Sequence, residues 1–231
     1  MGIDIQANVQ KIREVIEKAA AKAGRSPESV KLMAVSKTID AEKIDQALKA
    51  GIQHLGENRV QEAVAKKPLL SLRPYTFHLI GPLQKNKVNK AVEIFDWIDT
   101  VESLELASKI NRACELSRKK MPVLIEVNLD KEPSKSGVVE EDVRDLVEKM
   151  SPLRHLSIRG LMCVPPFLED PEEVRPYFVR LRRLAETMAE WRIENVSMDE
   201  LSMGMSHDFP VAIEEGATLV RLGTAIFGPR H

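Results

Sequence analysis

The sequence has no excess of either charge and no long apolar run, and these two absences exclude several classes of protein. Among its 231 residues, 34 are Lys or Arg and 35 are Asp or Glu, which gives a net charge of −1. Such a balance offers no field that would attract nucleic acid or an anionic membrane. The apolar runs are all far shorter than the roughly 20 residues that a membrane-spanning helix needs. We therefore expect no nucleic-acid partner and no membrane association.

Cysteine is scarce, and the amino terminus carries no secretory pattern. Cys114 and Cys163 lie far apart in the sequence, and the five histidines are scattered. Neither residue type shows the spacing of a metal site, so no metal is predicted. The first residues lack a basic segment followed by an apolar one, as a signal peptide requires. These features predict a cytoplasmic protein that keeps its thiols reduced.

Segments with the pattern of buried strands alternate with segments of helical pattern along the whole chain, which predicts parallel βα units. The predicted strands cover residues 31–36, 53–56, 76–80, 97–100, 123–129, 158–164, 200–203 and 218–222. The predicted helices cover residues 5–23, 41–50, 59–66, 84–91, 103–119, 140–150, 172–190 and 208–216. The leading helix is expected to stop at Gly24, because glycine readily adopts the left-handed conformation that ends helices.

Eight such units close most simply as a (β/α)8 barrel of the TIM type. The last helix would be very short, and the leading helix could fill the outer position that it leaves vacant. The alternative is an open doubly wound sheet, but the Gly-x-Gly-x-x-Gly fingerprint of that fold is absent after the first strand. No linker rich in Gly, Ser or Pro divides the chain, so we predict a single α/β domain over residues 1–231.

Lys37 is the first candidate for chemistry, since it follows the apolar run 32–35 at the end of the first predicted strand. The carboxyl ends of parallel strands are where α/β proteins collect their functional groups. A lysine there, with apolar residues behind it, can be partly desolvated and can attack an aldehyde. The alternative is a lysine that only ends a strand and points at water.

The segment 219–227 predicts a phosphate site. It reads as a strand that turns through Gly223 into a short helical start, with the Thr224 hydroxyl alongside. Glycine allows close approach of the backbone, and a helix start offers unpaired N–H groups. Gly204 and Ser206 follow the seventh predicted strand, and barrel phosphate sites are frequently built from the loops after strands seven and eight. Alternatively, both glycines only form turns and Ser206 only caps the next helix.

Arg221 lies inside a buried strand and therefore needs a partner. A guanidinium beside a heteroaromatic nitrogen would keep that nitrogen unprotonated, because two cations repel each other. The alternative is a buried ion pair with a carboxylate such as Glu57. Met203 flanks Gly204 and could back a flat ring, or it could simply fill the core. The lysine, the phosphate site and the arginine together describe pyridoxal 5′-phosphate held as a Schiff base.

A different short motif lies in or near each of several predicted strand ends. The motifs are Ala-Val-Ser-Lys-Thr at 34–38, Gly-Glu-Asn-Arg-Val-Gln-Glu at 56–62, His-Leu-Ile-Gly at 78–81, Glu-Val-Asn at 126–128, Gly-Leu-Met at 160–162, Leu-Ser-Met-Gly-Met-Ser-His-Asp-Phe at 201–209 and Val-Arg-Leu-Gly-Thr-Ala-Ile-Phe-Gly at 220–228. In this order, they resemble the pyridoxal phosphate homeostasis proteins, which are relatives of the barrel domain of alanine racemase. The resemblance covers essentially the whole chain.

The resemblance implies a role for each matching residue. Lys37 looks like the lysine that forms the Schiff base, and Arg221 looks like the arginine that faces the pyridine nitrogen. The remaining expected cofactor contacts are Ser206, Gly223 and Thr224 at the phosphate, Asn58 beside the ring, and His78 and Met203. Lys135 is expected near the mouth of the site, and nothing is assigned to Pro82, where many members carry another residue.

Two classes of function stay open, and we favour a carrier that takes part in pyridoxal phosphate homeostasis without strong turnover. Racemisation, the alternative, needs a second acid–base group opposite the lysine. In alanine racemase this group is a tyrosine supplied by an extra β domain. This chain is too short to contain such a domain. Tyr75 and Tyr177 fall at unsuitable places, and His78 is the best remaining base. An arginine at the pyridine nitrogen also weakens the ring as an electron sink.

A third reading, a phosphosugar enzyme on the same fold, leaves Lys37 and Arg221 less well explained. We therefore predict no catalytic residue. The expected partners are pyridoxal phosphate itself and the apo-enzymes that depend on it. The chain is expected to be a monomer, because racemases dimerise through the domain that is missing here.

Overall fold

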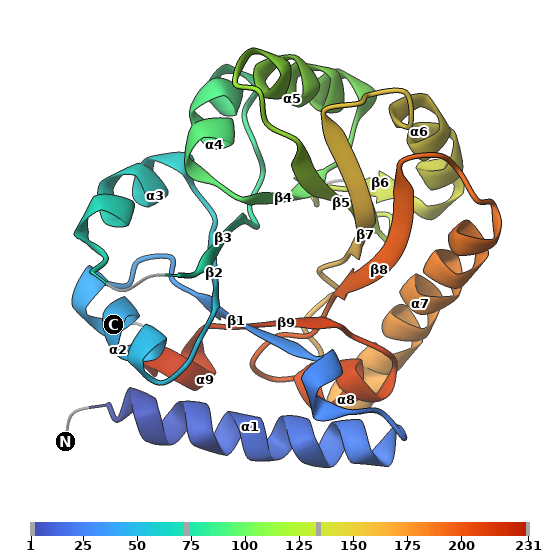
Figure 1. Ribbon diagram of the computed structural model, residues 1–231. Coiled ribbons are helices and arrows are strands. Elements are labelled where there is room, and N and C mark those ends of the chain that lie inside the picture. Colours follow the sequence, from blue (N-terminus) through green and yellow to red (C-terminus); the bar gives the residue numbers. More distant parts are fainter. Residues whose placement is uncertain (1–2, 72–73, 133–134, 230–231) are drawn as a thin grey trace.

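The computed structural model describes residues 3–71, 74–132 and 135–229, and Figure 1 shows its helices surrounding a ring of strands. The strands are β1 (Lys31–Val35), β2 (His54–Glu57), β3 (Thr76–Leu79), β4 (Trp97–Val101), β5 (Met121–Asn128), β6 (Val138–Val139), β7 (Leu156–Met162), β8 (Val196–Ser202) and β9 (Leu219–Leu222). The α-helices are α1 (Ile5–Lys22), α2 (Ala41–Lys49), α3 (Val60–Lys66), α4 (Val88–Ile94), α5 (Leu104–Leu116), α6 (Val143–Met150), α7 (Arg175–Glu190), α8 (Phe209–Glu214) and α9 (Thr224–Phe227).

The strands close into a barrel in which every pairing in the described part of the chain is parallel. The order runs β4-β3-β2-β1-β9-β8-β7-β5, and β4 pairs with β5 to complete the ring. The short β6 adds to β5 outside this ring. The predicted (β/α)8 barrel is therefore confirmed, and the doubly wound alternative is wrong because an open sheet has two edge strands. Within the described residues, no helix has both the length and the apolar character needed to cross a bilayer.

Side chains alternate between two environments along each strand. Val123, Ile125 and Val127 of β5 belong to the hydrophobic core between sheet and helices. Since successive strand residues point to opposite faces, Glu126 and Asn128 face the inside of the barrel. By the same alternation Arg221 faces inward, between two core residues of β9. The interior thus contains charged groups whose burial is costly unless they are paired.

Helix α1 completes the outer layer, as predicted. Its buried residues Ile5, Val9, Ile12 and Ile16 recur every three or four positions, which places them on one apolar face. Figure 1 shows α1 lying along α2, α9 and α8, and it contacts all three. The very short α9 leaves room on this side of the barrel, and α1 covers it.

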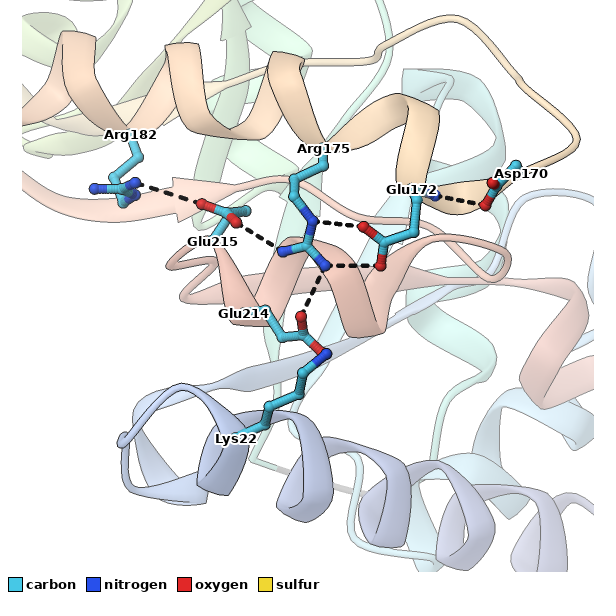
Figure 2. Close-up of polar contacts among 7 residues, drawn as sticks. All are labelled: Lys22, Asp170, Glu172, Arg175, Arg182, Glu214 and Glu215. Carbon is cyan, nitrogen blue, oxygen red and sulfur yellow. Dashed lines mark hydrogen bonds and ion pairs between the residues drawn. The ribbon is translucent and has the colours of Figure 1, made fainter.

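A network of ion pairs joins α1, α7 and α8 (Figure 2). Arg175 contacts Glu214 at 2.8 Å and Glu215 at 2.7 Å, and it also bonds Glu172 in the 3₁₀ turn that precedes α7. Lys22 of α1 reaches Glu214 at 2.7 Å. Arg182 adds a longer contact to Glu215, and Asp170 caps the short turn that holds Glu172. The network therefore fixes the carboxyl end of α8, the helix that follows the loop carrying Ser206.

The predicted boundaries differ from the structure in a few places. Strand β8 begins at Val196, four residues before its predicted start. Its first half alternates polar and apolar residues, which is the pattern of a partly exposed strand and not of the continuous apolar run on which the prediction relied. The predicted helices 84–91, 140–150 and 172–190 each open with a 3₁₀ turn, at Lys85–Lys87, Glu140–Asp142 and Pro171–Val174. The sequence pattern also missed β6 and the 3₁₀ turns Pro27–Ser29 and Lys67–Leu69, which are too short to show a period.

Candidate functional site

The carboxyl ends of the parallel strands meet at one rim, and four expected site residues lie there. Lys37 follows β1, Asn58 follows β2, Ser206 follows β8 and Gly223 follows β9. Strand β9 lies between β1 and β8, and its Arg221 is the register partner of Met33 in β1. Lys37 and Gly223 therefore leave neighbouring strands at the same end of the barrel.

Ser206 joins the loop after β8 to the start of α9. Its Oγ accepts the N–H groups of Gly223 at 3.3 Å and Ala225 at 3.2 Å. The loop can turn this sharply because Gly204 has φ of +91°, and a Cβ there would lie 2.6 Å from Ala212 Cβ. The N-cap of α8 is Asp208, so the alternative that Ser206 caps that helix is wrong. A hydroxyl beside converging main-chain N–H groups is suited to an anion.

Arg221 is a buried cation held by neutral acceptors. It donates to Ser202 Oγ at 2.7 Å and to the main-chain oxygen of Cys163 at 2.8 Å, and it is 5% exposed. Burial lowers the pKa of its guanidinium. The alternative partner, Glu57, instead accepts from Ser36 and pairs with Lys66, each at 2.8 Å. The alternative of an ion pair between Arg221 and Glu57 is therefore wrong.

The inner face of β5 carries a buried carboxyl group that sequence reasoning did not single out. Burial raises the pKa of Glu126 to about 7, the Glu102 carboxylate adds to the rise, and Arg221 opposes it. Neither Glu126 Oε2 nor Asn128 Oδ1 has a hydrogen-bond partner in the described part of the chain. The available signal was an acidic residue inside an otherwise apolar strand.

His78 takes part in a polar chain inside the barrel. Its Nδ1 lies 3.2 Å from the Asp99 carboxylate and its Nε2 lies 3.2 Å from His54 Nδ1. Its ring also stacks on Trp97. Since His54 begins β2, this chain extends from His78 toward the rim opposite Lys37. The expected contact between His78 and a cofactor stays a prediction.

The other expected residues lie around the same mouth. Met203 is fully buried directly after β8, Asn58 is half-buried, and Thr224 is exposed at the start of α9. Lys135 lies in the loop after β5, as expected for the mouth, and pairs with Asp130 and Glu132. The cofactor roles of all these residues stay predictions.

The remaining polar candidates lie elsewhere. Tyr75 packs edge-on against Phe77 before β3, at the rim opposite Lys37, and Tyr177 lies in α7 and packs against the hydrophobic core. Cys114 is buried in α5, and burial raises the pKa of its thiol to about 11. Cys163 is also buried, and burial raises its thiol pKa to about 12. No group of His, Cys, Asp and Glu in the described residues could hold a metal ion.

Comparison with known proteins places this geometry in a family. Residues 5–231 match the family model of the alanine racemase N-terminal domain. The pyridoxal phosphate homeostasis protein of Aquifex aeolicus is 42% identical over 222 residues, which cover 96% of each chain. The protein of that name from Escherichia coli K12 is 40% identical over 98% of this chain and 97% of its own. The chain belongs to the pyridoxal phosphate homeostasis protein family.

Solved structures agree with this membership. PipY of Synechococcus elongatus PCC7942, in its structure with PLP bound, is 40% identical and superposes with a TM-score of 0.82 over 93% of this chain and 100% of its own. Alanine racemase of Clostridium difficile 630 superposes with a TM-score of 0.74 at 14% identity, which shows a shared fold alone. This chain covers 98% of its own length in that match but 56% of the racemase. The predicted resemblance to the pyridoxal phosphate homeostasis proteins is thus confirmed.

Proposed function

We propose that this chain binds pyridoxal 5′-phosphate covalently through Lys37 and takes part in its cellular homeostasis as a carrier. The observation that supports this most is the meeting of three groups at one rim: Lys37, the Ser206 hydroxyl with the N–H groups it accepts, and buried Arg221. The PLP-bound structure of PipY, a relative at 40% identity, supports the same ligand.

The donor set of the rim fits this ligand. The N–H groups of Gly223 and Ala225 and the Ser206 hydroxyl would hold the phosphate, and Gly223 has no side chain to keep the anion away. When bound, pyridoxal phosphate supplies an aldehyde that bonds to an amine and a ring that withdraws electrons. Lys37 would supply the amine, and Thr224 would add a second hydroxyl at the phosphate.

The position of Arg221 favours a carrier of pyridoxal phosphate rather than an enzyme that uses it. A guanidinium facing the ring nitrogen disfavours protonation of that nitrogen, because the two positive charges would repel. Ser202 and the Cys163 carbonyl hold Arg221 in place without neutralising its charge. The ring would then withdraw electrons weakly, so a bound amino acid would be activated little. Asn58 and Met203 would hold the ring, with Met203 behind it.

A racemase also needs a second acid–base group opposite the lysine. Within the described residues, Tyr75 precedes β3 at the opposite rim, Tyr177 packs against the hydrophobic core from α7, and both ring nitrogens of His78 face protein partners. We therefore assign no catalytic residue. The proposal includes a monomeric, cytoplasmic carrier that delivers its ligand to apo-enzymes, and the two cysteines, which form no disulfide, agree with a reducing compartment.

The first test is the site of attachment. Wild-type protein loaded with pyridoxal phosphate should be yellow, and borohydride should remove the visible band while fixing the ligand to Lys37, as located by peptide mass spectrometry. Lys37→Ala should lose the fixed adduct, because it lacks the amine. Lys43→Ala, a change on the exposed side of α2, should keep it. A reducible adduct at another lysine in Lys37→Ala would contradict the assignment.

The second test separates carrier from enzyme. Loaded protein is incubated with alanine, serine and other amino acids, and product chirality and keto-acid release are measured. We expect no appreciable turnover. Turnover that disappears in Lys37→Ala would replace the carrier with a racemase or a related enzyme.

A further inference from the structure

Two acceptor atoms on the inner face of β5 are buried without a partner in the described part of the chain. They are Glu126 Oε2 and Asn128 Oδ1, on residues that are each 7% exposed. Buried polar atoms are nearly always hydrogen-bonded in folded proteins. Two such atoms two residues apart on the same face of one strand therefore suggest that a ligand supplies the missing donors.

The orientation of these atoms is fixed by their surroundings. Asn128 Nδ2 donates to the main-chain oxygens of Glu132 at 2.9 Å and Lys135 at 3.4 Å. Both partners are acceptors, so the amide cannot be reversed and Oδ1 must turn away from that loop. Glu126 interacts electrostatically with Arg221 inside the barrel, but its Oε2 accepts no hydrogen bond from any of the described residues.

The acceptors lie across the barrel from Lys37. In the closed order, β9, β8 and β7 separate β1 from β5 on one side, and β2, β3 and β4 separate them on the other. A ligand anchored by its phosphate at the end of β9 thus meets two different walls at the mouth. One wall offers an amine, which captures an aldehyde, and the other offers a carboxyl oxygen and an amide oxygen.

We propose that Glu126 and Asn128 receive a primary ammonium group, so that the same mouth also binds pyridoxamine 5′-phosphate without a covalent bond, with the ring turned about its phosphate so that the amine faces β5 instead of Lys37. This inference rests on the proposed function, because it uses the same phosphate site. An aldehyde has no hydrogen to donate to these acceptors, whereas an ammonium group has three hydrogens and a positive charge. Lys37 cannot bond covalently to an amine, so the β5 wall supplies the recognition that Lys37 supplies for the aldehyde.

The test compares two phosphate ligands that differ in one group. Calorimetry measures the dissociation constants of pyridoxamine 5′-phosphate and of pyridoxine 5′-phosphate, which carries a hydroxyl in place of the amine, on protein freed of ligand. We expect wild type to bind the amine roughly tenfold more tightly, the value of a charge-assisted hydrogen bond. Glu126→Gln should bring the two constants to within about twofold, because it removes the charge. Glu148→Gln, an exposed change on α6, should keep the wild-type ratio.

A second measurement, on wild-type protein, tests the inference if Glu126→Gln does not fold. The preference for the amine should rise between pH 6 and pH 8, because Glu126 ionises in this range and the phosphates of both ligands titrate alike. The groups that face Glu126 are Glu102 after β4, Arg221 on β9 and the Cys163 thiol after β7, and the thiol stays neutral at these pH values.

Three results would overturn the inference. They are equal affinities in wild type, an unchanged ratio in Glu126→Gln, and equal weakening of both ligands in Glu126→Gln, which would mark a purely structural role. Borohydride fixation of pyridoxal phosphate on the same preparation separates the two proposals. If Lys37 is labelled and the amine is not preferred, the inference fails and the proposed function stands. If neither phosphate ligand binds and Lys37 is not labelled, both fail.

Discussion

Glu126 shows how a single buried acid makes stability depend on pH. Burial raises the pKa of its carboxyl to about 7 in the folded chain, against roughly 4.3 when unfolded. Between these values the folded state binds more protons than the unfolded state. Stability is therefore lost as pH rises through this window and is unaffected below it. For Glu126 alone, the loss between pH 5 and pH 8 is on the order of 2 kcal/mol.

We expect Glu126→Gln to remove this loss in ligand-free protein, because glutamine does not titrate. Urea unfolding at pH 5, 6, 7 and 8 measures the free energy of unfolding of each variant, and the difference between Glu126→Gln and wild type should grow with pH. Glu148→Gln, which changes an exposed side chain, should follow wild type throughout. A constant difference across the four pH values would mean that Glu126 is ionised in the folded protein at pH 5.

At the scale of single residues, the sequence pointed to Arg221 because it interrupts an apolar strand, and to Lys37 because it follows one. Their roles toward the cofactor stay predictions. The partners of Arg221 could not be predicted, because one is the main-chain oxygen of Cys163, and every residue has such an oxygen. The unsatisfied atom of Glu126 was missed because a sequence does not show which buried acids lack a cation.

At the scale of elements, the contacts of α8 decide how firmly the Ser206 loop is held. Gly204 and Asp208 shape the amino end of this helix, and the ion pairs of Figure 2 fix its other end. Most of these charges are only partly exposed, 25% for the Arg175 side chain and 15% for Glu214 and for Glu215. Such pairs are less screened by water than surface pairs are.

Arg175→Ala should therefore lower the free energy of unfolding by about 1–3 kcal/mol, since it leaves two partly buried carboxylates with one cation fewer each. Urea unfolding at neutral pH measures the loss. Lys149→Ala, which breaks an exposed surface pair with Asp145 on α6, should change stability by less than about 0.5 kcal/mol. Equal losses in the two variants would show that the network acts no differently from ordinary surface pairs.

Elements were predicted from the sequence more reliably than their ends or their partners were. The strands of the barrel follow from apolar runs, and α1 follows from its apolar face, whereas 3₁₀ turns and β6 are too short to show a period. The network around Arg175 could not be predicted, because its members come from α1, the start of α7 and α8, and only the fold brings them together.

At the scale of the whole molecule, closing the ring requires some strands to shift register. The pairing of β7 shifts on both sides near Gly160, with β5 and with β8. Against β5 the extra residue is Arg159, whereas against β8 the extra residues lie in β8, between Val196 and Glu200. The Arg159 side chain pairs with Asp199 of β8 at 2.9 Å. Gly160 itself has φ of +155° and lies against the main chain of Glu200. Such a bulge bends a strand and increases its twist, which a closed barrel needs.

Gly160→Ala tests this requirement, because a Cβ at this position would lie 1.8 Å from the Glu200 main-chain oxygen. The strands β7 and β8 would have to separate, so we expect a loss of at least about 3 kcal/mol in the free energy of unfolding. Gly24→Ala is the matched control, since Gly24 has φ of +66° but a Cβ added there would meet no atom within 4 Å. It should lose only about 1 kcal/mol, the cost of the left-handed backbone. Similar losses in both variants would mean that backbone conformation, rather than the close approach of β7 to β8, makes glycine necessary at position 160.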